Sequence, residues 1–543
     1  MPAFTITVLS EGKKMDQGYE LLSVDVSREV NRIPYAQLTL LDGSAPKRKF
    51  AISDTGFFDP GKPLEIKIRY EGKPDKTLFK GVVVAQGVEA DAVKSVLTIE
   101  AKDLAFKMTQ IRANQVFPKQ SDAKLLKKVL GKYDVKVGGI PDTQPEHEEI
   151  VQYDCTDWDF MLSRAEVNGL LVKVDNGKVS MQKIELDDSP KKTFEYGISE
   201  IYNFEIEANA GGQYEEVDSI SWDAKNQKMS QTIKAKDVSL SPGDLDAKTL
   251  AHGLDAKAYT LTSPAVLAPK EMQAWADAKM ARSRLGLIRG RLSLPGFTDI
   301  ALLDTVELKG IGKRFNGKTL VTGIRHRIAE QGWATDVQFG LAADCFSARA
   351  GVAALPAAGL LPPVGGLHIG IVAGFEEDPE KQFRVKVKIP ALGEKQGALW
   401  ARLASPDAGK ARGFFFRPEP GDEVVLGFFN DDPRQPVIIG SLFGSKNAPP
   451  DKFKVEKENK AKGLVTKKGT LIGFDDEKGT VFIETPKSNK ILLDDDGKRI
   501  QLADANKNTI TLDADGITLK SGKDFKLEAS GKVEIKGSKV DIK

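Results

Sequence analysis

The sequence predicts a mainly β protein, with barrels and inserted helices in its amino-terminal part and a repeated short strand at its carboxyl end. Three observations predict this class. Apolar and polar residues alternate with period two in the first hundred positions, a second strand-rich unit begins near residue 368, and pairs of apolar residues recur regularly after residue 490. Alternation with period two is the pattern of strands that bury one face.

Residues 1–350 are expected to form two β-barrel subdomains. Four segments show the strand alternation most clearly, at residues 5–8, 36–40, 64–68 and 96–99. A chain of 543 residues is too long for a single hydrophobic core, so several domains are expected.

Three helices are predicted to interrupt these barrels. The first covers residues 122–130, where Ser121 can cap the amino end and apolar residues form one stripe. The second follows Thr156, which opens a capping box, and ends at Gly169. The third covers about residues 271–285.

The later part of the chain is predicted to hold four segments. Residues 351–367 contain prolines and glycines but no charge, and are expected to be a linker. Residues 368–445 have the size of a small five-stranded barrel, with residues 383–389 as their clearest strand. A neck is expected over residues 446–469 and a β-helical needle over 470–543.

Apolar pairs separated by one residue repeat through the last segment, about eight residues apart, with polar turns between them. The expected core positions are Ile491, Leu493, Ile500, Leu502, Ile510, Leu512, Ile517, Leu519, Phe525, Leu527, Val533 and Ile535, and a last pair is Val540 and Ile542. Each strand has only two inward side chains, so one copy cannot enclose a core but three copies around an axis can. The pattern therefore predicts an intertwined, trimeric, triple-stranded β-helix with hydrogen bonds between chains. A set of hairpins in an ordinary sandwich, or a sticky tail, remains the alternative.

Charge and composition narrow the function classes. The chain has 79 basic and 77 acidic residues, which gives no net attraction to nucleic acid. Its start lacks the basic flank and apolar core of a signal peptide, so assembly in the cytoplasm is expected. Cys155 and Cys345 are expected to be small buried hydrophobes rather than a disulfide or zinc pair.

Patterns that suggest enzymes have simpler explanations. Residues 312–319 satisfy the phosphate-binding pattern G-x-x-x-x-G-K-[ST], but a strand rather than a helix is predicted after them, which indicates a hairpin turn. The aspartate-rich segments 494–497 and 513–516 lack the closing glutamate of a calcium loop and are predicted to be turns. The four histidines are scattered along the chain. No catalytic residue, cofactor or metal site is therefore predicted.

Several segments resemble the VgrG and phage hub-spike family. In the amino-terminal part these are NRIPYA at 31–36, LFKGV at 78–82 and WDFMLSRAE at 158–166. The longest match is PEPGDEVVLGF at 418–428, continued by DDPRQPVIIGS at 431–441, which resembles the OB-fold signature of that family. The matches occur in the family's order and span nearly the whole chain.

The resemblance implies a non-enzymatic homotrimer in a contractile injection machine of the type VI secretion or phage-tail kind. In such a machine the hub caps the inner tube and meets the hub adaptor and baseplate proteins. The needle carries a PAAR-repeat tip protein, which would place Val540, Ile542 and Lys543 at that contact, and it punctures the target membrane mechanically. A cell-wall-binding hydrolase or adhesin on a repeat stalk is the alternative. The sequence leaves open whether the particle is a type VI, extracellular or phage device, and what its cargo and target cell are.

Overall fold

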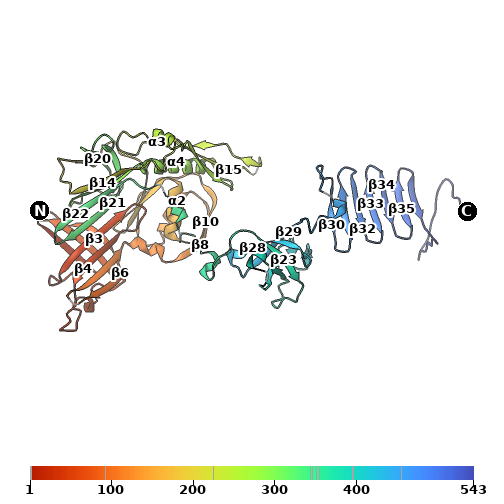
Figure 1. Ribbon diagram of the computed structural model, residues 1–543, viewed down its shortest axis with the longest axis horizontal. Coiled ribbons are helices and arrows are strands. Elements are labelled where there is room, and N and C mark those ends of the chain that lie inside the picture. Colours follow the sequence, from red (N-terminus) through yellow and green to blue (C-terminus); the bar gives the residue numbers. More distant parts are fainter. Residues whose placement is uncertain are drawn as a thin grey trace. The chain divides into compact units, whose positions relative to one another are not determined.

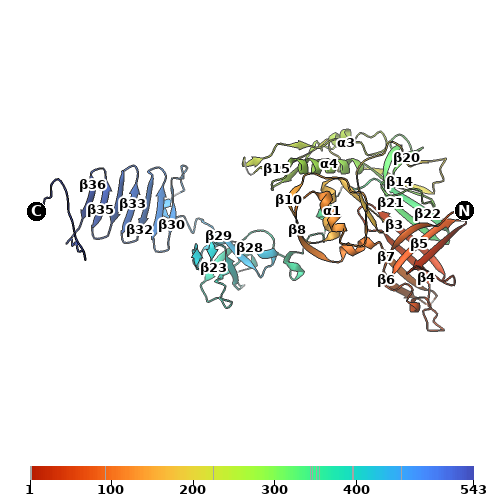
Figure 2. The same cartoon turned by 180° about the vertical axis from the view of Figure 1, so that it is seen from behind.

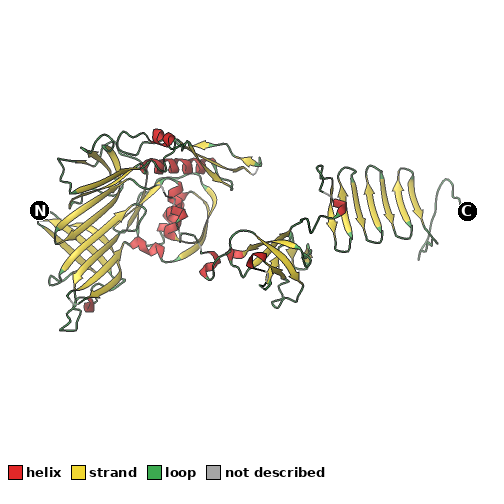
Figure 3. Cartoon of the chain, viewed as in Figure 1, coloured by secondary structure: helices red, strands yellow, loops and turns green. Residues whose placement is uncertain are grey.

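The computed structural model is mainly β, as predicted (Figure 3). It describes residues 3–91, 93–223, 226–342, 344, 346–349, 351–353, 355–393, 395, 397–453 and 455–543. Cys345 lies outside the described residues, and Cys155 is half-buried. The chain divides into two compact units, Met1–Ala354 and Leu355–Lys543, and each is described by itself.

A thirteen-stranded sheet forms most of the first unit (Figure 1). Its main path runs β14-β19-β22-β21-β3-β4-β7-β6-β5-β1-β2, and β13 and β20 join it through β21. The bounds are β1 Phe4–Ser10, β2 Lys13–Lys14, β3 Leu21–Glu29, β4 Tyr35–Leu41, β5 Pro63–Tyr70, β6 Lys76–Ala90, β7 Ser95–Lys102, β13 Lys192–Glu195, β14 Asn203–Ala208, β19 Ile288–Pro295, β20 Thr305–Lys309, β21 Gly317–Ala329 and β22 Gly332–Phe339.

This sheet covers two separate hydrophobic cores. One contains Leu38, Ile66 and Phe79 from the early strands, and the other contains Val321 and Phe339 from the late strands. The long strand β21 connects them, because its first residues pair with β20 and its later residues pair with β3. The two cores therefore share one continuous sheet.

Four α-helices lie in the described part of the first unit, and the first two of them form a third core with smaller strands. The four helices are α1 Asp122–Leu130, α2 Asp157–Val167, α3 Ala247–Gly253 and α4 Pro269–Leu285. The sequence predicted all of these except α3. None of the helices in the described part of the chain is long and apolar enough to span a bilayer.

Local hydrogen bonds explain where α1 and α2 begin. Thr156 caps α2 as predicted, accepting a hydrogen bond from the Asp159 amide at 3.0 Å. Ser121 occupies the cap position of α1, but its side chain makes no capping bond. The Thr143 hydroxyl accepts a hydrogen bond from the Ala123 amide at 2.8 Å instead. The residue that satisfies this helix end is therefore twenty positions away in sequence.

The remaining strands of the first unit form three small sheets. The ribbon of β8 and β10 curves past α1 (Figure 2). Their bounds are β8 Arg112–Gln120, β9 Lys136–Val137, β10 His147–Thr156, β11 Leu170–Asp175, β12 Lys178–Lys183, β15 Glu216–Asp223, β16 Lys228–Met229, β17 Ile233–Lys234 and β18 Ala258–Ser263.

The second unit begins with a closed five-stranded barrel, in the order β23-β24-β25-β29-β28. The barrel strands and a small hairpin between them are β23 His368–Gly374, β24 Val385–Lys388, β25 Leu399–Leu403, β26 Ala408–Gly409, β27 Arg412–Gly413, β28 Glu423–Phe428 and β29 Pro436–Ser441. Its core includes Val387, Val424 and Ile438. The strand predicted from residue 383 starts only at Val385, because Phe383 has a φ of 58° and lies exposed.

Seven consecutive strands form the last sheet, each hydrogen-bonded to the next in antiparallel order. They are β30 Ala461–Val465, β31 Leu471–Asp475, β32 Thr480–Glu484, β33 Lys490–Asp494, β34 Arg499–Ala503, β35 Thr509–Asp513 and β36 Gly516–Lys520. The sheet starts inside the segment expected to be a neck.

The strand pairing corrects one expectation. Hydrogen bonds between strands were predicted to run between chains, but from residue 461 to 520 they run within one chain. The physical reason is the length of the turns, which is short enough to close a hairpin. This segment is therefore a meander rather than an intertwined helix, and what a single chain leaves unsatisfied is its apolar face rather than its backbone.

Candidate functional site

One face of the C-terminal sheet carries two columns of apolar side chains. Directly paired residues of an antiparallel sheet lie on the same face, so the register defines these columns. The first column is Leu464, Ile472, Ile483, Ile491, Leu502, Ile510 and Leu519. The second is Phe474, Val481, Leu493, Ile500, Leu512 and Ile517. We call the two columns together the apolar face.

The apolar face is uncovered in the single chain. Apart from the half-buried Val481, its side chains are 38–72% exposed. Single exposed apolar residues are common on protein surfaces, but a continuous apolar surface of this kind is typical of an association site. Eight of the predicted core residues, from Ile491 to Leu519, lie on it.

Sequence reasoning missed the first part of the apolar face. Ile472, Phe474, Val481 and Ile483 continue the same two columns toward the barrel. The signal was present, since each pair again has one residue between its members. The glycine between Ile472 and Phe474 and the phenylalanine between Val481 and Ile483 obscured the alternation with polar residues.

The opposite face of the sheet is covered at its start and polar at its end. The Phe482 ring lies over Gly473, where a Cβ atom would be only 2.4 Å from Phe482 Cζ. Leu492 is buried beside them. Farther along, the same face carries Gln501 and then threonines. The chain therefore leaves only one side of this sheet as an apolar surface.

The last 23 positions contain the rest of the predicted core but no regular strand. Phe525, Leu527, Val533 and Ile535 are 48–69% exposed, and Val540 and Ile542 are exposed as well. Phe525 lies with Ile491, Leu502 and Ile510 around a groove of about 520 Å³. The structure thus brings Phe525 to the apolar face and leaves the other five residues away from a packed core.

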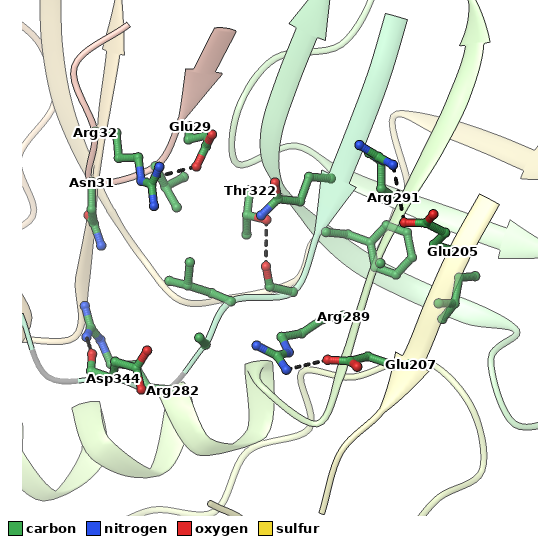
Figure 4. A pocket seen from close by; sticks show the side chains of 18 of the residues that line it. Glu29, Asn31, Arg32, Glu205, Glu207, Arg282, Arg289, Arg291, Thr322 and Asp344 are labelled. Carbon is green, nitrogen blue, oxygen red and sulfur yellow. Dashed lines mark hydrogen bonds and ion pairs between the residues drawn. The ribbon is translucent and has the colours of Figure 1, made fainter. Parts of the chain in front are cut away.

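A charged cavity of about 610 Å³ lies in the first unit, between the ends of β3, β14, β19 and β22 (Figure 4). Three ion pairs stand on its wall: Arg289 with Glu207, Arg291 with Glu205, and Arg32 with Glu29. The Thr322 hydroxyl donates to the Gly340 carbonyl oxygen at 2.7 Å. Each of these groups has a partner from a neighbouring strand or turn, an arrangement that holds strands together.

A buried polar cluster joins three helices of the first unit. Arg164 of α2 donates to both carboxylate oxygens of Asp122 at 2.7 and 2.9 Å, and also to Glu271 of α4 at 3.1 Å. His147 and Asn168 complete the cluster at 3.2 and 2.9 Å from Asp122. Burial by itself raises the pKa of the Asp122 carboxyl, but the hydrogen bonds from His147, Arg164 and Asn168 outweigh it and hold that pKa well below its usual range.

The motifs that suggested enzymes take structural roles. Residues 312–316 lie in the turn between β20 and β21, and residues 317–319 begin β21 and pair with β20. The Lys318 ammonium donates to the Asp188 carbonyl oxygen at 2.5 Å. Asp494 accepts a hydrogen bond from the Gly497 amide at 2.8 Å, which is turn chemistry. Burial lowers the pKa of His326 to about 3, so this side chain is a neutral core residue at pH 7. Among the described residues, no group of three metal-ligating side chains could hold an ion.

Family models match three parts of the chain. They are the Alg8 N-terminal domain over residues 1–330, the type VI secretion system/phage-baseplate injector OB domain over 368–443, and the phage baseplate V C-terminal trimerisation domain over 480–543. The fold and the apolar face thus define a hub-spike protein, with a large sheet in its first unit, an OB barrel and a C-terminal trimerisation domain. Over residues 1–330, more than half of its length, the chain belongs to the Alg8 N-terminal domain family. Its OB and trimerisation domains, together with the curated relatives below, identify it as a member of the VgrG and phage hub-spike family.

Curated relatives match shorter segments. The actin cross-linking toxin VgrG1 of Vibrio cholerae is 31% identical over 128 residues, which are 22% of this chain and 12% of the toxin. The type VI secretion system spike protein VgrG1b of Pseudomonas aeruginosa is 28% identical over 196 residues, 32% of this chain and 26% of the relative. The matches thus span about an eighth to a quarter of the relatives' length.

Solved structures show more distant likenesses. A tail protein from Neisseria meningitidis shares 14% identity and a TM-score of 0.47, over 62% of this chain and 96% of that protein. The tail protein of prophage MuSo2 from Shewanella oneidensis shares 12% identity and a TM-score of 0.47, over 63% of this chain and 99% of that protein. Likeness at this level carries no weight for function.

Proposed function

We propose that this chain is one protomer of a homotrimeric spike that caps the inner tube of a contractile injection machine and punctures a target membrane. One observation supports this most strongly. A segment matched by a trimerisation domain carries an ordered apolar lattice on one face of its sheet and leaves it open to water. When three chains turn these faces toward a common axis, each apolar face is shielded from water by the other two.

The proposed core extends along the whole C-terminal segment. It includes the two columns of the apolar face and continues through Phe525, Leu527, Val533 and Ile535. Burying an exposed leucine or isoleucine contributes about 1.5–3 kcal/mol, so even half of these positions stabilise a trimer strongly. A stiff prism of this kind transmits axial force, which is the mechanical requirement for puncture. No covalent chemistry is needed.

The two ends of the chain have separate proposed partners. The first unit would meet the tube ring, the hub adaptor and the baseplate proteins, and would nucleate their assembly. Val540, Ile542 and Lys543 would receive a PAAR-repeat tip protein. Family membership favours this spike over the alternative of a cell-wall-binding hydrolase or adhesin on a stalk, because it accounts for the OB barrel and the trimerisation domain together.

Mass in solution tests the trimer. The full chain is expected to sediment as three chain masses and to resist SDS at room temperature. Deleting residues 490–543 removes most of the apolar face, so this variant should lose the trimer or dissociate at far lower denaturant. A full chain that remains monomeric at micromolar concentration would contradict the proposal.

The tip contact is tested by co-purification with the PAAR-repeat protein encoded nearest to this gene. The pair Val540→Asp and Ile542→Asp should lose the tip protein while the trimer remains. Thr518→Asp, an exposed change on the polar face of β36, is the matched control and should retain it. Equal capture by both variants would remove these residues from the proposed contact.

A further inference from the structure

The turns at the two ends of the strands in the C-terminal sheet carry opposite charge. We call the row of turns at each end an edge of the sheet. Because the sheet is a meander, alternate turns lie at opposite ends of its strands (Figure 1). We define the acidic edge as residues 475–480, 494–499 and 513–516, and the basic edge as residues 465–471, 484–490, 503–509 and 520–524. The acidic edge has eight acidic and three basic residues, and the basic edge has seven basic and three acidic residues.

Much of this charge is unbalanced within the chain. Asp476 and Glu477 of the first acidic turn pair with Lys462 and Lys460, so that turn is locally neutralised. The later turns are different. In the described part of the chain, the carboxylates of Asp495, Asp496 and Asp515 form no salt bridge. Among the basic-edge lysines described there, Lys467 pairs with Glu419 at 2.8 Å and the others form no salt bridge.

Symmetry decides what these edges meet. In any ring with a threefold axis, the left edge of one sheet is adjacent to the right edge of the next, because all contacts are related by rotation. When the apolar faces point to the axis, each acidic edge therefore lies beside a neighbour's basic edge. If two sheets lay side by side and were related by a twofold axis perpendicular to them, their strands would be antiparallel and like edges would meet.

We propose that the acidic and basic edges form the corners of the trimeric prism and fix the three chains in parallel orientation and in register. This inference rests on the proposed trimeric spike and adds the device that aligns it. The occupant of each edge is a second copy of this chain. The apolar face contributes most of the affinity, whereas charged contacts at an exposed corner contribute mainly specificity and the rate of encounter.

The spacing of the turns supports the same arrangement. On each edge a turn recurs every second strand, and the turns of one edge are offset by one strand from those of the other. Strands are about 4.8 Å apart, so turns of one edge fit between turns of the neighbour's edge without axial displacement. Correct register therefore brings each acidic turn beside basic turns of the next chain.

Charge reversal in the full chain tests the proposal. The acidic-edge variant carries Asp495→Lys, Asp496→Lys and Asp515→Lys, and the basic-edge variant carries Lys468→Glu, Lys487→Glu and Lys507→Glu. Each variant alone has two like-charged edges. At low ionic strength each should raise the concentration of half-dissociation by about tenfold or more, while the six-fold variant, which exchanges the signs, should recover to within about threefold of the unmodified chain.

The control adds positive charge elsewhere, through Gln501→Lys, Thr511→Lys and Thr518→Lys on the outer face. It should dissociate like the unmodified chain. Recovery in the variant with all six substitutions would show that the single-edge variants were not weakened by general destabilisation, because it contains every change that they contain. If the single-edge variants behave like the control, or if the six-fold variant fails to recover, the corner contact is overturned and the trimer itself stands.

Chemical cross-linking gives an independent reading of orientation. In a background with Cys155→Ser and Cys345→Ser, Asp495→Cys and Ala505→Cys lie at opposite ends of β34, about 16 Å apart by the strand rise. A maleimide linker shorter than this should join chains into a covalent trimer only when both cysteines are present. Dimers from either single-cysteine variant would overturn parallel packing, and a monomeric unmodified chain would overturn the proposed function as well.

Discussion

At the scale of single residues, each residue of the apolar face is expected to occur three times around the axis of the trimer. One substitution therefore changes three side chains that lie near that axis. Leu493 lies between Val481 and Ile500 in the second column. Leu493→Asp removes about 2 kcal/mol of apolar burial from each chain and brings three carboxylates close to the axis. The variant should be monomeric by sedimentation. Thr518→Asp on the other face is the control, and a trimer formed equally well by both variants would exclude the apolar face as the interface.

The Asp122 carboxylate gives the first unit a defined dependence on pH. Its pKa is lowered in the folded state, so its contribution to stability is present above its ordinary pKa of about 3.9 and is lost as the pH falls below that value. Asp122→Asn should destabilise the first unit by about 3 kcal/mol at pH 7, because Arg164 stays buried without its full partner. As the pH falls from about 4 to about 2, the variant should lose less stability than the unmodified chain, because it lacks the carboxylate whose pKa is lowered by folding.

Denaturant unfolding of the first unit at several pH values measures both effects. The matched control is Asp134→Asn, a change at a side chain that is 90% exposed. It should leave the stability and its pH dependence unchanged. Parallel pH profiles for Asp122→Asn and the unmodified chain would show that the cluster does not respond to pH.

At the scale of elements, the start of α1 depends on a residue outside the helix. Thr143→Val removes the hydroxyl that accepts from Ala123 while keeping the shape of the side chain, and should cost about 1 kcal/mol. Ser121→Ala should cost much less, since the Ser121 side chain makes no capping bond. Thermal unfolding of the two variants distinguishes them, and the opposite order of stability would contradict this assignment.

The hairpin meander sets which part of the needle can form before the chains meet. Strands β30–β36 satisfy their backbone hydrogen bonds with their own neighbours in sequence. The outer face of this sheet also packs locally, through Phe482 over Gly473 and the buried Leu492. The sheet is therefore complete within one chain. Association is expected to bury its apolar face and to require no exchange of strands between chains.

At the scale of the whole molecule, trimer formation and tip binding should separate. A chain truncated after Lys520 keeps both columns of the apolar face and should remain trimeric, with loss of the proposed tip contact. A chain truncated after residue 489 keeps only the first part of the columns and should dissociate. Native mass spectrometry of the two truncations, with and without the tip protein, measures both properties. Dissociation of the longer truncation would place the main interface in residues 521–543.

The sequence by itself determined the mainly β class, the helices at residues 122 and 157, and the recurrence of apolar pairs, because each is a periodic or capping signal within a few residues. It also indicated three copies, since two inward side chains per strand cannot enclose a core.

Only the tertiary structure decided how distant residues meet. It showed that β21 joins the two cores of the large sheet, that Thr143 rather than Ser121 caps α1, and that Ile472 and Phe474 belong to the columns. It also placed acidic and basic turns on opposite edges, which requires the strand pairing to be known. Periodicity fixes which side chains share a face, but hydrogen-bond register between strands fixes which side chains are neighbours, and that register depends on contacts the local sequence does not contain.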